Sequence, residues 1–250
     1  MGKTDISVIV VTLQNNPDEI DSICRLHELD SDFELIIRND EGISKARNNG
    51  IDSASNDKII FLDDDAVPEP GYIEAASKAL DKHPVVVGAV QSPDKNVFDE
   101  LAVHYRDPNK LVGCNMGFQR KVFEEVGYFD QDFHWGHEET ELQNRITTRH
   151  ALYYEPDMLV THAYADSFTD YANKMWKLGK VDIDYWIKTK PWTSICRSKS
   201  QSKHVDHSWI NKSLKGRMYE SIGRIIRIIS MAVGLPQRLF VKLSFMSFNQ

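Results

Sequence analysis

The order of apolar and polar positions predicts strands that alternate with helices over the first 165 residues. Residues 6–13 (ISVIVVTL) form an unbroken apolar, β-branched run, which is typical of a strand buried on both faces of a parallel sheet. Shorter runs predict further strands at 33–37, 58–62, 84–90, 111–118 and 152–154. Helices are predicted from 16 (with Asn16 as N-cap), at 42–54, from 68 to about 82, and at 120–126 and 138–149. Such alternation indicates an α/β sheet with ligands at the carboxyl ends of its strands.

Beyond about residue 165 the pattern changes. Residues 167–170 (SFTD) resemble a capping box and predict the start of a helix. The polar stretch 197–207 has no apolar period, so we expect a mobile loop at about 197–208. A basic tail follows at 211–250, in which Ile222, Ile225, Ile226 and Ile229 recur at helical spacing among Arg224 and Arg227 and predict an amphipathic helix. We therefore expect one domain at 1–165 and a helical C-terminal extension at 166–250.

Charge is unevenly distributed along the chain. The 250 residues carry a net charge of −7, with 41% hydrophobic and 27% charged residues, which suits a globular protein. Residues 211–250 contain seven basic residues and one acid, Glu220, so the rest of the chain is strongly acidic. An acidic body argues against broad nucleic-acid binding and leaves open a metal site or a small-molecule enzyme.

The cysteines and the first residues bear on location. Cys24, Cys114 and Cys196 are odd in number, far apart and without the spacing of a metal site, which suits a reducing compartment. No apolar run is long enough for a simple membrane-spanning helix, and the first residues do not form a secretory signal. We expect a cytoplasmic protein.

Three acids, Asp63, Asp64 and Asp65, follow directly after the predicted strand at 58–62. Neighbouring carboxylates repel one another unless a cation neutralises them, and Mg²⁺ or Mn²⁺ prefers such oxygen ligands. Alternation along an extended chain directs Asp63 and Asp65 to one side and Asp64 to the other. The alternative is a solvated acidic turn.

Two further groups of residues could carry chemistry. Glu138 and Glu139 open a predicted helix just after Trp135, where they could act as a general base beside a sugar-binding ring, or merely complement the helix dipole. His162 follows an apolar strand and could be a metal ligand, although a lone histidine there is more often structural.

Six segments follow one another between about residue 6 and residue 167: ISVIVVTLQNN, GISKARNNGI, FLDDD with its D-x-D, GCNMGFQRKVFEEVGYFDQDF, WGHEETEL and VTHAYADS. In this order they resemble the family 2 glycosyltransferases of the GT-A fold. The fold expected from the resemblance is a Rossmann-like, mostly parallel sheet flanked by helices.

The resemblance implies a role for each matching position. The metal ligands would be Asp63, Asp65 and His162, holding Mn²⁺ or Mg²⁺ against the diphosphate of a nucleotide-sugar, with a UDP-sugar as the expected donor. Glu139 matches the catalytic base of inverting members, and Glu138 remains an alternative because the base is a Glu where Asp is commoner. The donor-binding residues would be Thr12, Asp40, Lys45, Arg47, Asp63, Asp64, Gly113, Asn115, Met116 and Trp135. In family members an Asp after the second strand binds the base of the nucleotide. The segment after residue 33 is shorter here than usual, and Asp40 is the candidate for that contact.

These features predict an inverting glycosyltransferase that transfers one sugar to an acceptor hydroxyl, on a glycan or a lipid-linked acceptor. The rival functions are a nucleotidyltransferase on a related fold and a catalytically degenerate sugar-nucleotide-binding or scaffold protein. The tail at 211–250 has two interpretations: an amphipathic helix that contacts the membrane peripherally at its cytoplasmic face, or a helix packed on its own domain. The sequence does not indicate an oligomeric state.

Overall fold

The computed structural model describes residues 5–29, 32–94, 96–189 and 212–247. The predicted mobile loop at about 197–208 lies outside the described residues. The chain divides into two compact units. The first comprises Met1–Lys95 and Ala102–Ala163, and the second comprises Asn96–Leu101 and Tyr164–Gln250.

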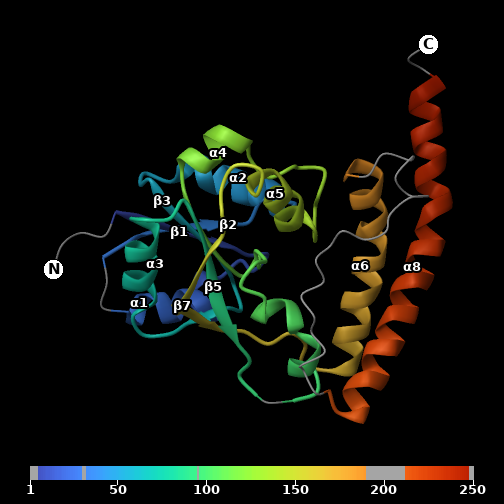
Figure 1. The fold of residues 1–250 in the computed structure, drawn as a ribbon, viewed down its shortest axis with the longest axis horizontal. Helices are drawn as coiled ribbons and strands as arrows, with labels where there is room; N and C mark the ends of the chain where they lie inside the picture. The colour runs from blue at the N-terminus through green and yellow to red at the C-terminus, as the bar shows by residue number, and fades with distance from the viewer. Residues whose placement is uncertain (1–4, 30–31, 95, 190–211, 248–250) are drawn as a thin grey trace. The chain divides into compact units, whose positions relative to one another are not determined.

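The first unit is built on a seven-stranded sheet (Figure 1). Its strands, in spatial order, are β2 (Glu34–Arg38), β1 (Ile6–Val11), β3 (Lys58–Asp63), β6 (Asn115–Gln119), β5 (Val85–Gln91), β7 (Tyr153–Thr161) and β4 (Val67–Pro68). The predicted strands are present, and β7 extends well beyond the three residues expected for it. Strand β4 was not predicted.

The sheet is mixed, and most of its strands are parallel as expected: five strands point one way, and only β6 and β4 run opposite to them. Strand β1 pairs in parallel with β2 and β3, and β5 pairs in parallel with β7. Strand β6 is antiparallel to both β3 and β5, and β4 is antiparallel to β7. The antiparallel insertion of β6 brings the beginning of that strand beside the carboxyl end of β3, since Leu62 pairs with Asn115.

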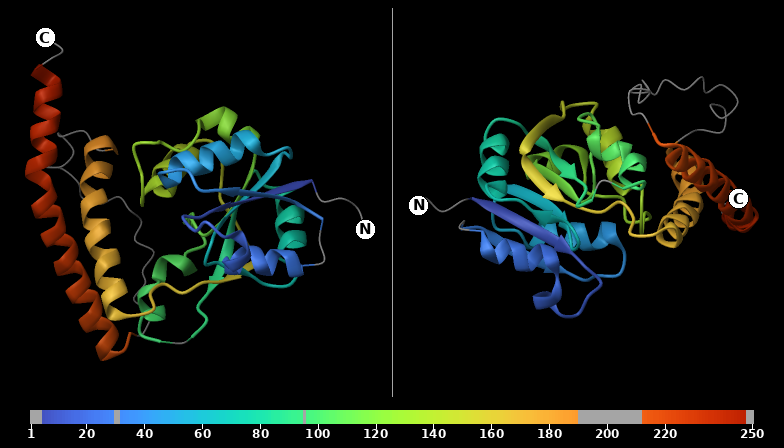
Figure 2. Two further views of the ribbon diagram at one scale, coloured as in Figure 1. Left: turned by 180° about the vertical axis from the view of Figure 1, so that it is seen from behind. Right: turned by 90° about the horizontal axis from the view of Figure 1, so that it is seen from below.

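Helices cover both faces of the sheet (Figures 1 and 2). Helices α1 (Asp21–Glu28) and α3 (Tyr72–Leu80) pack on one face, in a core that includes Val8, Ile60 and Val86. Helices α2 (Ile43–Ser53), α4 (Lys121–Val126) and α5 (Glu138–Ile146) pack on the other face, over Ile9, Phe61 and Phe118. Neighbouring strand residues therefore enter opposite cores, which explains the unbroken apolar runs.

The first predicted helix is interrupted. Asn16 caps only a short 3₁₀ turn, η1 (Pro17–Glu19), by accepting a hydrogen bond from the Asp18 N–H. Ile20 is extended and fully buried, and α1 begins after it. Burying Ile20 in the core therefore outweighs continuing the helix from its capping sequence.

The second unit pairs two long helices, α6 (Phe168–Thr189) and α8 (Leu214–Ser247), with a short 3₁₀ turn, η2 (Asp99–Leu101). The helices run parallel, because Tyr171 lies against Gly223 and Gly179 against Arg227 and Ser230. Arg227 forms an ion pair with the buried carboxylate of Asp182. None of the described helices is both long and apolar enough to cross a membrane.

Candidate active site

The acidic triplet lies where the carboxyl ends of several strands meet. Asp63 ends β3, and Thr12 directly follows the neighbouring strand β1. The Thr12 hydroxyl donates a hydrogen bond of 2.6 Å to Asp64 Oδ2, which joins these two strand ends. His162 directly follows β7, and its Nε2 lies 3.1 Å from Asp65 Oδ1. The fold thus brings together five of the predicted site residues, which are up to 150 positions apart.

The donor set here fits a divalent cation. Ligand atoms of Asp63, His162 and Cys114 lie within 4.8 Å of one another. His162 is buried, and its Nδ1 has no hydrogen-bond partner among the described residues. Burial raises the pKa of Asp63, against the lowering effect of Arg47, and a bound cation would offset that penalty. Carboxylate oxygens and an imidazole nitrogen are ligands that Mn²⁺ accepts.

Arg47 connects the strand-end acids to α5. It projects from α2 and is almost fully buried, at 1% exposure. Its Nη1 donates a 2.6 Å hydrogen bond to Glu138 Oε1, and its Nη2 contacts Asp63 Oδ1 at 3.3 Å and donates to the Gly113 carbonyl at 3.1 Å. The guanidinium lies over the aromatic rings of Phe61 and Phe129, which contact each other edge-on. One buried cation therefore holds three segments of the site in place.

Glu138 and Glu139 occupy different environments. Glu138 is 3% exposed and bound to Arg47, and burial raises its pKa to about 7, helped by the neighbouring Glu139 and opposed by Arg47. Glu139 is half-buried and accepts a hydrogen bond from the Thr140 hydroxyl. Of the two carboxylates, that of Glu139 is therefore more accessible to a substrate.

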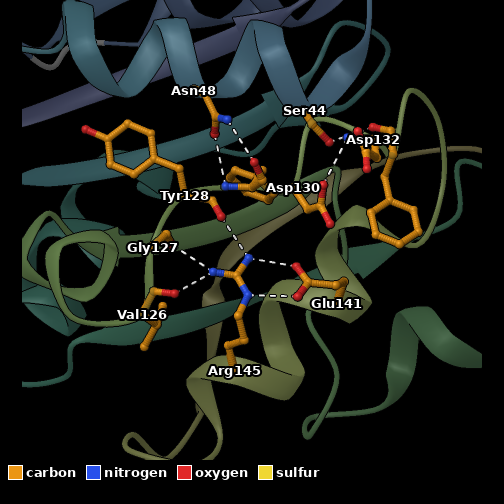
Figure 3. A network of polar contacts seen from close by, with 11 residues as sticks. Ser44, Asn48, Val126, Gly127, Tyr128, Asp130, Asp132, Glu141 and Arg145 are labelled. Carbon is orange, nitrogen blue, oxygen red and sulfur yellow. Dashed lines mark hydrogen bonds and ion pairs between the residues drawn. The ribbon is translucent and has the colours of Figure 1, made fainter. Parts of the chain in front are cut away.

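The loop that leads into α5 is held rigidly (Figure 3). Asn48 of α2 exchanges two hydrogen bonds with the backbone of Phe129, and Ser44 donates to the Phe133 carbonyl. Arg145 of α5 binds Glu141 and donates to the carbonyls of Val126, Gly127 and Tyr128.

The same loop ends in an uncommon backbone conformation. Gly136 and His137 both have positive φ, at 77° and 65°. A positive φ is strained for a side chain such as that of His137, and such strain is common where a fold positions functional groups. It directs the chain so that α5 begins with the two glutamates.

Three of the predicted donor-binding residues lie at the start of β6 and differ in what they can do. Gly113 accommodates Arg47, because a Cβ there would lie 2.9 Å from Nη2. Asn115 is fully buried: its amide donates to the carbonyls of Ala89 and Met158, and its oxygen accepts from the Tyr72 hydroxyl. The Met116 side chain lies in the core beneath α2, α4 and α5. The structure thus places the Asn115 and Met116 side chains inside the protein.

The other predicted donor contacts lie nearer the surface. The Asp40 carboxylate follows β2 and is bound by Arg38 and Asn49. Lys45 on α2 is exposed, and Trp135 is 36% exposed. These three positions are therefore more accessible to a ligand than Asn115 and Met116.

Sequence reasoning missed Cys114 and Tyr105. Cys114 was set aside because its spacing from the other cysteines is not that of a metal site, yet its thiol faces Asp63 and His162. The ring of Tyr105 contacts His162 edge-on, with centroids 5.4 Å apart. Cys114 directly precedes β6, and the antiparallel pairing of β6 with β3 brings it beside the acids. The sequence shows this position of Cys114 but not the pairing.

Comparison with known families agrees with this geometry. The family model described as "Glycosyl transferase family 2" matches residues 3–140, more than half of the chain. The chain belongs to glycosyl transferase family 2. The resemblance stated from the six sequence segments is therefore confirmed.

This family 2 member has curated relatives of greater length. The glucosyl-dolichyl phosphate glucuronosyltransferase of Haloferax volcanii is 29% identical over 145 residues, covering 49% of this chain and 45% of that protein. The uncharacterized glycosyltransferase YwdF of Bacillus subtilis is 28% identical over 173 residues, covering 52% of this chain and 63% of that protein. The chain thus spans only about half to two thirds of the length of these relatives.

A solved structure confirms the fold. The mannosyltransferase PcManGT from Pyrobaculum calidifontis, in complex with GDP-Man and Mn²⁺, superposes with a TM-score of 0.55 at 15% identity, covering 99% of this chain and 81% of that one. The family 2 chain therefore has the GT-A fold with a helical C-terminal region, as expected from its sequence.

Proposed function

We propose that the protein is an inverting, metal-dependent glycosyltransferase that moves one sugar from a nucleotide-sugar donor to an acceptor hydroxyl. The observation that carries the proposal is the buried Arg47, which contacts both the D-x-D acid Asp63 and the helix-entry acid Glu138. This contact supports the proposal, because it joins an acid of the candidate cation site to the residue next to Glu139, the proposed base. Family membership supports the same activity.

The residues would divide the work as follows. Asp63, Asp65 and His162 would hold Mn²⁺ or Mg²⁺, which would neutralise charge on the leaving diphosphate. Glu139 would take the proton of the acceptor hydroxyl as its oxygen attacks the anomeric carbon and the bond to the diphosphate breaks on the opposite face. Glu138 is less suited to this role because it is buried and bound to Arg47.

Donor and acceptor follow from weaker observations. Thr12 directly follows β1, and the Arg47 guanidinium reaches Asp63 at the end of β3, where a donor nucleotide and its diphosphate would approach. A UDP-sugar is the donor that we expect. The Haloferax volcanii relative is a glucosyl-dolichyl phosphate glucuronosyltransferase, and its name supports a lipid-linked or glycan acceptor for this chain. The free thiols of Cys24 and Cys114 support a cytoplasmic location.

The metal assignment is tested with Asp65→Ala. Calorimetry should show that the wild-type protein binds its donor more tightly with Mn²⁺ and that the variant loses this gain. A thermal-shift screen of UDP-, GDP- and dTDP-sugars, with and without Mn²⁺, would first identify the donor. Equal donor binding by the variant in Mn²⁺ would refute the assignment.

The base assignment is tested with Glu139→Gln and its neighbour Glu138→Gln as the matched control. Glu139→Gln should keep donor affinity while turnover collapses. If Glu138→Gln shows this behaviour instead, the base is Glu138. If the wild-type protein neither transfers nor hydrolyses any donor in Mn²⁺, it is a degenerate sugar-nucleotide-binding protein.

A further inference from the structure

Helix α8 leaves a long apolar stripe uncovered. Among its described side chains, six apolar ones are between 50% and 86% exposed, and all belong to one part of the helix surface. These residues are Leu214, Met218, Ile225, Ile228, Ile229 and Val233. Gly216, Gly223 and Ser230 are buried on one side of the helix. At 100° per residue, the six exposed apolar side chains lie on the opposite side.

The structure changes which residues form the amphipathic face predicted from the sequence. Ile226 packs against the small core of the second unit, and Arg227 is bound to Asp182. Neither residue belongs to the free surface. Ile225, Ile228 and Ile229 form its apolar centre instead.

Basic residues flank the stripe on both sides. By the same helical geometry Lys215 lies on one flank, and Arg217 and Arg224 lie on the other. All three are exposed. Glu220 is the one acid in residues 212–234, and it is paired with Lys212 and Arg224. The flanks therefore carry positive charge beside an apolar centre.

We propose that this stripe of α8 binds the surface of an anionic lipid bilayer, with its isoleucines in the interface and its flanking cations at the headgroups. An apolar stripe with basic flanks is the pattern of helices that lie in the membrane interface. Each basic residue near an anionic surface strengthens binding by about fivefold.

A second copy of the chain fits this surface less well. A two-fold pairing through the stripe would place each basic flank against another basic flank, and like charges repel. A protein partner would need acidic residues on both sides of an apolar groove. An anionic membrane offers an apolar interior for the stripe and negative headgroups for both basic flanks.

The inference concerns the second unit and is tested independently of catalysis. The full chain is sedimented with vesicles of phosphatidylcholine, alone or mixed with phosphatidylglycerol. The wild-type protein should pellet with the mixed vesicles and be released by high salt. Ile225→Gln/Ile228→Gln/Ile229→Gln should bind them roughly tenfold more weakly or worse, because three apolar side chains no longer enter the interface. Circular dichroism should stay unchanged, since these side chains are exposed in the folded protein.

A matched control is Leu13→Gln, which removes an apolar side chain that is 83% exposed in the other unit and should leave pelleting unchanged. Lys215→Ser/Arg217→Ser should weaken binding to the mixed vesicles but not to vesicles of phosphatidylcholine alone. The proposal is overturned if the wild-type protein does not pellet with anionic vesicles or if the triple isoleucine variant pellets equally. It is also overturned if light scattering shows a wild-type dimer that the triple variant dissociates while vesicle binding persists.

Discussion

Replacing Arg47 by methionine removes the cation that joins the two acidic parts of the site. Methionine has a similar length and can pack against the rings of Phe61 and Phe129, which the guanidinium now contacts. Glu138, however, loses its partner at 2.6 Å, and its Oε2 already has no hydrogen-bond partner among the described residues. We therefore expect Glu138 to remain protonated in the variant well above neutral pH.

The size of the effect depends on pH. Because the pKa of Glu138 is raised from 4.5 to about 7, both proteins lose stability equally as the pH rises toward 7. Near pH 6 the unfolding free energy of the variant should be lower by about 1.5–3 kcal/mol, because the charge-assisted hydrogen bonds of Arg47 are lost. Above pH 7 the wild-type carboxyl ionises beside Arg47 and that of the variant does not, so the loss grows by about 1.4 kcal/mol per pH unit. By about pH 8 the total reaches about 3–5 kcal/mol, the range for breaking a buried ion pair.

Urea unfolding followed by far-ultraviolet circular dichroism, between about pH 6 and about pH 9, measures this difference. The control is Arg47→Met/Glu138→Gln, in which no buried carboxyl remains to titrate at position 138. Its difference from wild type should be constant above pH 7. The reasoning is refuted if the loss in Arg47→Met is independent of pH, or if its pH dependence persists in the double variant.

Two further predictions concern the cation site and the helix pair. Cys114→Ser should leave the calorimetric affinity for Mn²⁺ nearly unchanged but weaken the affinity for Cd²⁺, because a thiol beside Asp63 favours soft metals. An equal loss of affinity for the two metals would contradict a role of the thiol at the cation site. Gly179→Ala should lower the unfolding free energy by about 1–3 kcal/mol, because its Cβ would lie 2.4 Å from the Arg227 carbonyl oxygen. Gly234→Ala is the matched control, since its Cβ would meet Ile183 at an ordinary 3.4 Å, and an equal loss in both variants would show that close helix packing is not the cause.

Much of the first unit could be predicted from local sequence. Strands β1, β3 and β5 are buried on both faces, so each is largely an apolar run such as residues 6–11, and the helices between the strands have apolar faces of helical period. The acids Asp63 to Asp65 could be assigned a site because a polar triplet directly after a buried strand lies at the ligand-binding edge of an α/β sheet.

The direction of β6 could not be predicted in the same way. A strand buried between two others has the same apolar pattern whether its neighbours are parallel or antiparallel. The pairing of β6 with β3 and β5 is decided by contacts between residues 29 to 61 positions apart, such as Leu62 and Asn115. This pairing is what places Cys114 beside the acids and the Asn115 side chain in the core.

The sequence by itself therefore determined the family, the succession of strands and helices, and the acids that could hold a cation. Only the tertiary structure decided that Arg47 and Glu138, 91 positions apart, form a buried ion pair. It also decided that Ile226 and Arg227 of α8 pack inward while Ile225 and Ile229 remain exposed. The physical reason is the same in each case: periodicity and local motifs report which residues can be buried together, whereas the partner of a buried charge and the uncovered side of a helix depend on segments distant in the chain.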